Sequence, residues 1–125
     1  MDDQLQTLIK TIQSYNKDAD IPLIEKAVDF AKKYHEGQTR SSGEPYYTHP
    51  LEVSILLAEM RLDEATLLTA ILHDTVEDTD ATLQDIEKQF GKEVASLVDG
   101  VTKLTRIESK TAEGKQAENF RKLVL

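Results

Sequence analysis

Apolar residues recur at intervals of three and four along almost the whole chain, and this periodicity restricts the fold more than any other feature. The first segment shows it with Leu5, Leu8, Ile9 and Ile12, and a late one with Val94, Leu97, Val98, Val101 and Leu104. Such spacing places the apolar side chains on one face of an α-helix. No segment alternates apolar and polar residues as a strand would, and no apolar run is long enough to span a bilayer. We therefore expect an all-α fold without a membrane segment.

Capping and helix-breaking residues divide the periodic pattern into separate helices. The expected helices cover residues 2–15, 22–37, 50–60, 64–74, 82–90, 94–104 and a last one from about 117. The fourth is apolar nearly all round, so it should lie at the centre of the core. Its end is expected at His73-Asp74, and Pro50 should begin the third helix one residue after His49. At 125 residues, one domain over 1–125 is expected.

Two segments lack helical periodicity and are expected to be loops. Residues 37–48 contain two glycines and a proline, and residues 106–116 are charged and contain Gly114. Long loops in compact domains tend to carry function. The first loop is therefore a candidate binding segment.

The composition of the chain argues against cysteine-based zinc fingers, cysteine hydrolases and general nucleic-acid binders. The chain has no cysteine, so a metal would be held by histidine nitrogen and carboxylate oxygen. A net charge of −8 argues against direct nucleic-acid binding, which needs clustered lysine and arginine. The first residues are acidic where a secretory signal would be basic, and this favours a cytoplasmic protein.

One group of residues has the chemistry of a metal site. His49, His73 and Asp74 precede the acidic pair Glu77 and Asp78, and all five occur where expected helices start or stop. Two imidazoles and a carboxylate suit a first-row divalent ion such as Mn²⁺ or Fe²⁺. If the helix continues past Asp74, Glu77 would share a face with His73 and Asp78 with Asp74. The alternative is a structural histidine followed by solvated acidic residues.

The first loop supplies the groups that an anionic ligand needs. Arg40, Ser41, Ser42 and Tyr46 offer a guanidinium group, two hydroxyls and an aromatic ring. Arginine binds phosphate through two hydrogen bonds or stacks on a base. The alternative is an ordinary solvated loop. His35, in the last turn of an expected helix, is assigned no role because the helix dipole favours a histidine there.

Several motifs together resemble the hydrolase domain of the Rel/SpoT family. The matching segments are residues 34–46 (Tyr-His-Glu-Gly-Gln-Thr-Arg-Ser-Ser-Gly-Glu-Pro-Tyr), 48–50 (Thr-His-Pro), 72–79 (Leu-His-Asp-Thr-Val-Glu-Asp-Thr), 90–91 (Phe-Gly), 97–104 (Leu-Val-Asp-Gly-Val-Thr-Lys-Leu) and 117–122 (Ala-Glu-Asn-Phe-Arg-Lys). They are long, in order and correctly spaced from about Ile21 onward. The resemblance implies an HD-domain helical bundle.

The resemblance also implies an activity and roles for single residues. The family removes the 3′-pyrophosphate of guanosine 3′,5′-bis(diphosphate), or of its triphosphate form, to give GDP or GTP. His49, His73 and Asp74 would ligate Mn²⁺, and Glu77 and Asp78 would help to activate the attacking water.

In the same way, the resemblance places the first loop at the nucleotide. Arg40 and Ser42 would line the guanine-nucleotide site. Ser41 stands where many Rel members have lysine, and the Arg-Ser-Ser form is shared with SpoT-like members. The lost positive charge would alter the preference for metal or substrate.

The resemblance further implies that the chain is only the N-terminal portion of such a domain. The family places a fourth metal ligand, an Asp, and a substrate-contacting Asn after the position of Leu125. We therefore expect little or no hydrolysis by the chain alone. The missing helices would leave apolar surface at Leu72, Val101 and Leu123 uncovered, and a second copy could cover it as a homo-oligomer. A non-catalytic remnant and a hydrolase of another nucleotide remain as alternatives.

Overall fold

The computed structural model describes residues 3–112 and the side chains of residues 3–104. Six helices follow one another in that part of the chain: α1 (Asp3–Tyr15), α2 (Ile21–Tyr34), α3 (Thr48–Glu59), α4 (Glu64–Asp78), α5 (Leu83–Phe90) and α6 (Lys92–Ala112). The described residues contain no strand, and the loop before α3 has one isolated bridge between Thr39 and Pro45. The predicted all-α fold is confirmed. None of these helices is long and apolar enough to cross a membrane.

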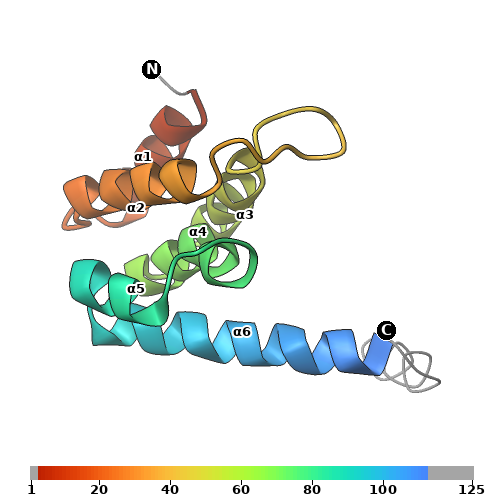
Figure 1. Ribbon diagram of the computed structural model, residues 1–125. Helices are drawn as coiled ribbons and strands as arrows, with labels where there is room; N and C mark the ends of the chain where they lie inside the picture. The colour runs from red at the N-terminus through yellow and green to blue at the C-terminus, as the bar shows by residue number, and fades with distance from the viewer. Residues whose placement is uncertain (1–2, 113–125) are drawn as a thin grey trace.

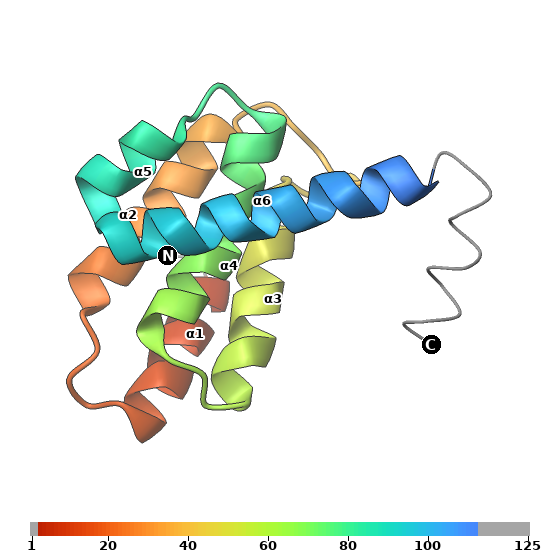
Figure 2. The same cartoon turned by 90° about the horizontal axis from the view of Figure 1, so that it is seen from below.

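Helix α4 is the centre of the bundle. It packs against α2, α3 and α6, while α1 packs on α3 and α5 packs on α6. Figure 1 shows the resulting arrangement, with α1 and α2 at one side of α3 and α4 and with α5 and α6 at the other. From below, α6 crosses α4 and α3 and extends beyond them (Figure 2). Six consecutive residues of α4, from Leu67 to Leu72, are buried, and this confirms the predicted central helix.

Local capping explains where several helices begin. The side chain of Asp20 accepts a hydrogen bond from the backbone N–H of Leu23 at the start of α2. Asp63 does the same for Thr66 at the start of α4. Each cap satisfies one of the backbone donors that a helix leaves unpaired at its N-terminus. At α5, Thr82 and Asp85 form the predicted capping box in both directions.

Four predicted boundaries are wrong. Helix α2 ends at Tyr34, three residues before the predicted stop at Gly37, because the chain then turns and the N–H of Gln38 donates to the carbonyl of His35. Helix α4 continues four residues past Asp74, because nothing in the segment that follows breaks a helix before Thr79. Helix α3 begins at Thr48, so His49 lies in its first turn instead of preceding it. Helix α6 runs to Ala112 through the start of the loop predicted for residues 106–116, because that stretch holds no proline or glycine before Gly114. The helix predicted from about Ala117 lies outside the described residues.

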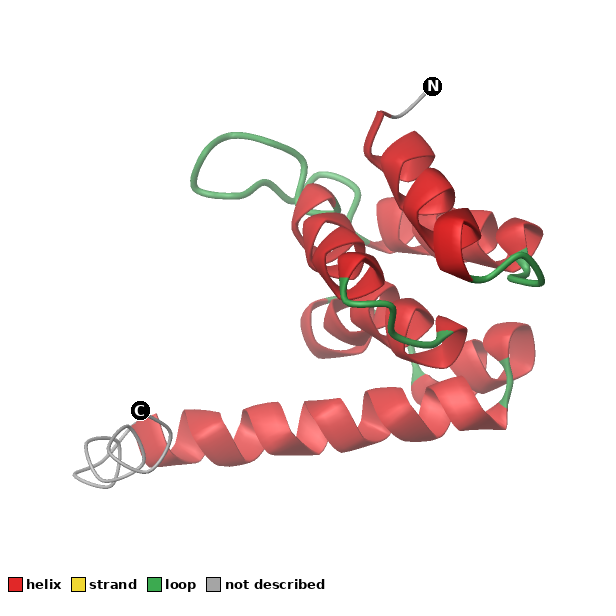
Figure 3. Cartoon of the chain, turned by 180° about the vertical axis from the view of Figure 1, so that it is seen from behind, coloured by secondary structure: helices red, strands yellow, loops and turns green. Residues whose placement is uncertain are grey.

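The loop between α2 and α3 keeps its predicted irregular structure. It stands out from the bundle in Figure 3. Gly37 and Gly43 adopt φ angles of +84° and +90°, a left-handed conformation that glycine takes without a steric penalty. The backbone N–H of Arg40 donates to the carbonyl of Glu44 at 2.8 Å, and that of Tyr46 to Gln38 at 3.0 Å. These bonds fold the loop back on itself beside the end of α4.

Candidate metal centre

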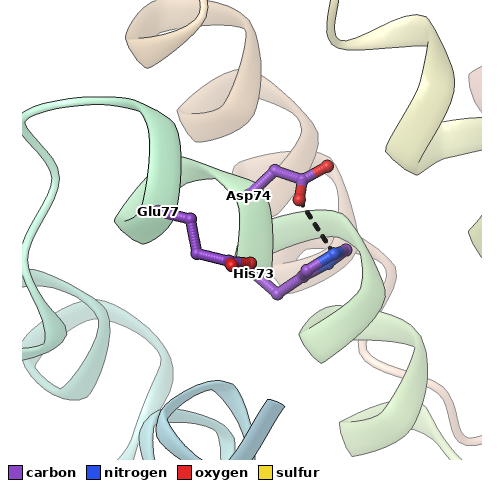
Figure 4. A group of neighbouring side chains, drawn as sticks. All are labelled: His73, Asp74 and Glu77. Atoms are coloured by element: carbon purple, nitrogen blue, oxygen red, sulfur yellow. Dashed lines mark ion pairs between the residues drawn. The ribbon is translucent and has the colours of Figure 1, made fainter. Parts of the chain in front are cut away.

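Three side chains at the end of α4 form a group that could hold a metal ion. His73, Asp74 and Glu77 each offer one ligand atom, and these atoms all lie within 4.8 Å of one another (Figure 4). The group exists because α4 continues past Asp74, which places Glu77 one turn after His73 on the same face. Nitrogen and carboxylate oxygen are suitable donors for a first-row divalent ion, so the residues present fit such a metal.

His73 and Asp74 are paired directly. Nε2 of His73 lies 2.9 Å from Oδ1 of Asp74, and both side chains are largely buried. Nδ1 of His73 lies 3.0 Å from the carbonyl oxygen of Ala70, to which a protonated Nδ1 would donate. Such a bond fixes the ring and leaves Nε2 as the nitrogen that faces the carboxylate, an arrangement common among histidines that bind metals.

The pairing raises the pKa of His73 and lowers the pKa of Asp74, so each side chain favours its charged form. Burial is the largest influence on the pKa of His73 and lowers it, but the hydrogen bond and charge of Asp74, the Ala70 carbonyl and Glu77 together raise it. Burial likewise would raise the pKa of Asp74, but the hydrogen bond and charge of His73, with His49 and His35, lower it. A buried carboxylate that stays ionised among histidines is what a divalent cation requires.

Tyr46 joins the loop to this centre. Its hydroxyl lies 3.4 Å from Oδ2 of Asp74 and 3.4 Å from Oδ2 of Asp78. Burial, followed by the charges of and hydrogen bonds to these two carboxylates, raises the pKa of Tyr46 to about 12. The phenol therefore stays protonated at neutral pH and donates. Asp78 is exposed and lies outside the group of three ligands.

His49 lies near the centre but outside the group of three. It is exposed in the first turn of α3, and its ring centroid is 6.5 Å from that of Tyr46. Its charge contributes to the lowered pKa of Asp74. The structure therefore brings His73 and Asp74 together and leaves His49 at the edge. Its role as a ligand stays a prediction.

The predicted nucleotide-binding residues lie on the loop in different environments. Nη1 of Arg40 forms ion pairs with Glu44 at 3.4 Å and Glu52 at 3.0 Å, and it donates to Oγ1 of Thr48 at 3.3 Å. Ser41 and Ser42 are exposed, and Oγ of Ser42 accepts a hydrogen bond from the backbone of Glu44 at 3.5 Å. Arg40 would therefore have to exchange carboxylates for phosphate if it bound a nucleotide.

His35, for which no role is predicted, lies beside the candidate centre. It is 2% exposed, and its ring lies 4.6 Å from that of Tyr46. Nδ1 is 3.0 Å from Oε1 of Gln38, and Gln38 donates from Nε2 to the carbonyl of Asp78 at 3.1 Å. Nε2 of His35 has no hydrogen-bond partner among the described residues. The one sequence signal is that His35 lies inside the matching segment 34–46, but nothing in that segment indicates that its ring is buried behind Tyr46.

An open cleft of about 500 Å³ lies beside the centre. It runs between the end of α2 and the residues that follow α4, and its lining includes Lys33, Gln38 and Asp78. A separate hollow of about 380 Å³ between α5 and α6 contains none of the predicted site residues. Of the predicted site residues, Asp78 is the one that the described lining of this cleft includes.

A helical bundle with an adjacent His-Asp pair on its central helix defines the class of the protein: an all-helical domain with a candidate centre for a divalent metal. The family model for the HD domain matches residues 27–125, and the chain belongs to that family.

Curated relatives bear out the predicted resemblance to Rel/SpoT proteins. The chain is 51% identical to the bifunctional (p)ppGpp synthase/hydrolase SpoT of Escherichia coli over 96% of its own length, and 49% identical to a GTP pyrophosphokinase of Myxococcus xanthus over 99%. It spans 17% of the length of each of these curated relatives. A solved structure of a metazoan SpoT ortholog that hydrolyses ppGpp superposes with a TM-score of 0.63 and 33% identity, over 76% of this chain and 61% of that one.

Proposed function

We propose that this protein is a cytoplasmic, Mn²⁺-dependent hydrolase that removes the 3′-pyrophosphate from (p)ppGpp. The products would be pyrophosphate and GDP, or GTP from the pentaphosphate. The observation that carries the proposal is the group of His73, Asp74 and Glu77 on the central helix of an HD-domain chain. The names of the SpoT relatives supply the substrate.

The metal would be held by His73 and Asp74, with His49 as a further ligand and Glu77 beside them. A bound Mn²⁺ supplies Lewis-acid activation of water and neutralises charge on the phosphoryl group. Asp74 contributes the anionic donor, and the Ala70 carbonyl keeps the His73 ring oriented towards it. Glu77 and Asp78 would accept a proton from the attacking water, and Asp78 lines the open cleft.

The loop would hold the nucleotide. Arg40 provides the guanidinium group, and the exposed hydroxyls of Ser41 and Ser42 would donate to a phosphate or a base. The carboxylates of Glu44 and Glu52 hold Arg40 in place before binding. Phosphate, as a competing partner of higher charge, would replace them through paired hydrogen bonds.

The proposal is tested by incubating the protein with ppGpp and Mn²⁺ and separating the nucleotides by anion-exchange chromatography. We expect little or no turnover by residues 1–125 alone. The same chain extended through the two helices that the family resemblance places after Leu125 should give GDP and pyrophosphate in equal amounts, with no turnover after chelation of the metal. Asp74→Asn in the extended form should abolish turnover, because it removes the anionic ligand at nearly constant shape. An extended form that is folded, binds Mn²⁺ tightly and leaves ppGpp intact would contradict the assignment.

A further inference from the structure

The hydroxyl of Tyr46 touches carboxylates and not the open face of the loop. It lies 3.4 Å from Oδ2 of both Asp74 and Asp78, which lie one turn apart on the same face at the end of α4. One phenol therefore stands between the anionic donor of the candidate metal centre and a carboxylate assigned to proton transfer. The sequence predicts Tyr46 at the nucleotide instead.

We propose that Tyr46 is a positioning residue that sets the relative placement of the Asp74 and Asp78 carboxylates. The effect of Tyr46 on catalysis rests on the proposed function, whereas its effect on metal affinity does not. Two carboxylates that share one donor repel each other less and are restrained in orientation. A ligand held in its binding orientation loses less conformational freedom when a metal binds.

The backbone of Tyr46 is anchored on both sides, and this makes the placement of its hydroxyl definite. Its N–H donates to the carbonyl of Gln38 at 3.0 Å, and its own carbonyl accepts from the N–H of His49 at 3.1 Å. The tyrosine is thus bonded to the start of the loop and to the first turn of α3. An anchored backbone limits the side chain to the few rotamers that reach α4.

The ring of Tyr46 is supported by His35. The two rings lie 4.6 Å apart at an angle of 38°, and His35 is buried behind the tyrosine. His35 in turn contacts Gln38, whose amide donates to the backbone carbonyl of Asp78. The contacts of Gln38 and of Tyr46 therefore end on the same residue of α4. The loop between α2 and α3 therefore holds the end of α4 through two separate hydrogen bonds to Asp78.

Positioning of the carboxylates and binding of the nucleotide are the two possible roles of Tyr46, and they predict different results for Tyr46→Phe. This variant keeps the ring on His35 and removes only the hydroxyl. Mn²⁺ affinity would be measured by titration calorimetry on the metal-free protein, and kcat and KM on ppGpp. Tyr47→Phe is the matched control, because Tyr47 is the next residue and its ring is instead covered by Lys32, with Nζ 5.1 Å from the centroid. Thermal unfolding would verify that each variant is folded.

We expect Tyr46→Phe to weaken Mn²⁺ binding by about 10-fold, the lower end of what an outer-shell partner contributes. In an active enzyme kcat should fall while KM stays unchanged, and Tyr47→Phe should match the wild type. Unchanged Mn²⁺ affinity combined with a raised KM would overturn the proposal and return Tyr46 to the nucleotide site. If the wild-type chain extended through the helices expected after Leu125 binds Mn²⁺ but hydrolyses nothing, the proposed function fails, and the Mn²⁺ affinities alone still decide the role of Tyr46.

Discussion

Nε2 of His73 lies 2.9 Å from Oδ1 of Asp74, although the two residues are neighbours in the sequence of one helix. Consecutive helical residues point in different directions and do not normally face each other. Here the imidazole is held at Nδ1 by the Ala70 carbonyl and turns Nε2 towards the carboxylate. The contact joins the two adjacent side chains into one edge of the candidate metal centre.

The first prediction concerns the anionic donor of this edge. Asp74→Asn should reduce Mn²⁺ affinity by at least about 10–100-fold, because losing even an outer-shell partner costs that much. Calorimetric titration of the metal-free protein measures it. Asp29→Asn, at an exposed position of α2, is the control and should leave the affinity unchanged. Equal affinities for wild type and Asp74→Asn would remove Asp74 from the metal site.

The second prediction is a pH dependence of the metal-free protein. The pKa of His73 is raised above its ordinary 6.5, so its contribution to stability is complete below pH 6.5 and is lost as the pH rises through the raised value. The pKa of Asp74 is lowered below 3.8, so its contribution is complete above pH 3.8 and is lost as the pH falls through the lowered value. The pair therefore stabilises most between pH 3.8 and 6.5.

Urea unfolding in the presence of a chelator tests this window. The free energy of unfolding of the wild type, minus that of His73→Gln, should be largest inside it and should decrease on both sides. A difference that stays constant from pH 4 to about 9 would show that the ion pair does not contribute.

The third prediction concerns a buried hydroxyl in α6. Thr102 is 3% exposed, and its Oγ1 has no hydrogen-bond partner among the described residues. A buried polar group without a partner costs about 1–3 kcal/mol. Thr102→Val keeps the shape and should raise the free energy of unfolding by about 1 kcal/mol in a urea titration. A clear loss of stability would reveal a partner for this hydroxyl.

The fourth prediction tests the cap of the helix that carries the site. Asp63 accepts hydrogen bonds from the backbone and the side chain of Thr66, and these bonds lower its pKa. Asp63→Ala should destabilise the protein by about 1 kcal/mol. Asp63→Asn should retain most of the stability, since asparagine is an equally good cap. Equal losses in both variants would point to the charge of Asp63 instead of its hydrogen bonds.

The fifth prediction concerns self-association through α6. Leu97 and Leu104 are 41% and 68% exposed and lie two turns apart on the same face of that helix. The prediction that Leu72 is exposed is wrong, because its neighbours enclose α4 and Leu72 is fully buried. Leu123, predicted to be exposed as well, lies outside the described residues. We expect a concentration-dependent dimer by sedimentation velocity, which Leu104→Lys should dissociate. A wild-type monomer at all concentrations would contradict this.

The sequence alone was sufficient for features that depend on neighbouring residues. Apolar spacing predicted the helices, and their ends were located where a cap or a glycine stood, as at Thr82 and Gly91. The near-continuous apolar character of residues 67–72 predicted a central helix, because a helix that is apolar on all faces must be buried on all of them. The candidate ligands His73 and Asp74 were identified because their chemistry is unusual at a helix end.

Only the tertiary structure decided which distant groups meet. Tyr46 and Asp74 are 28 positions apart, and the sequence contains nothing that directs this phenol to a carboxylate instead of a nucleotide. The pairing of Arg40 with Glu52, and the burial of His35 behind Tyr46, depend in the same way on how the loop folds against α3 and α4. Local rules determine helices because their hydrogen bonds join near neighbours, whereas a site depends on the packing that brings separate helices together.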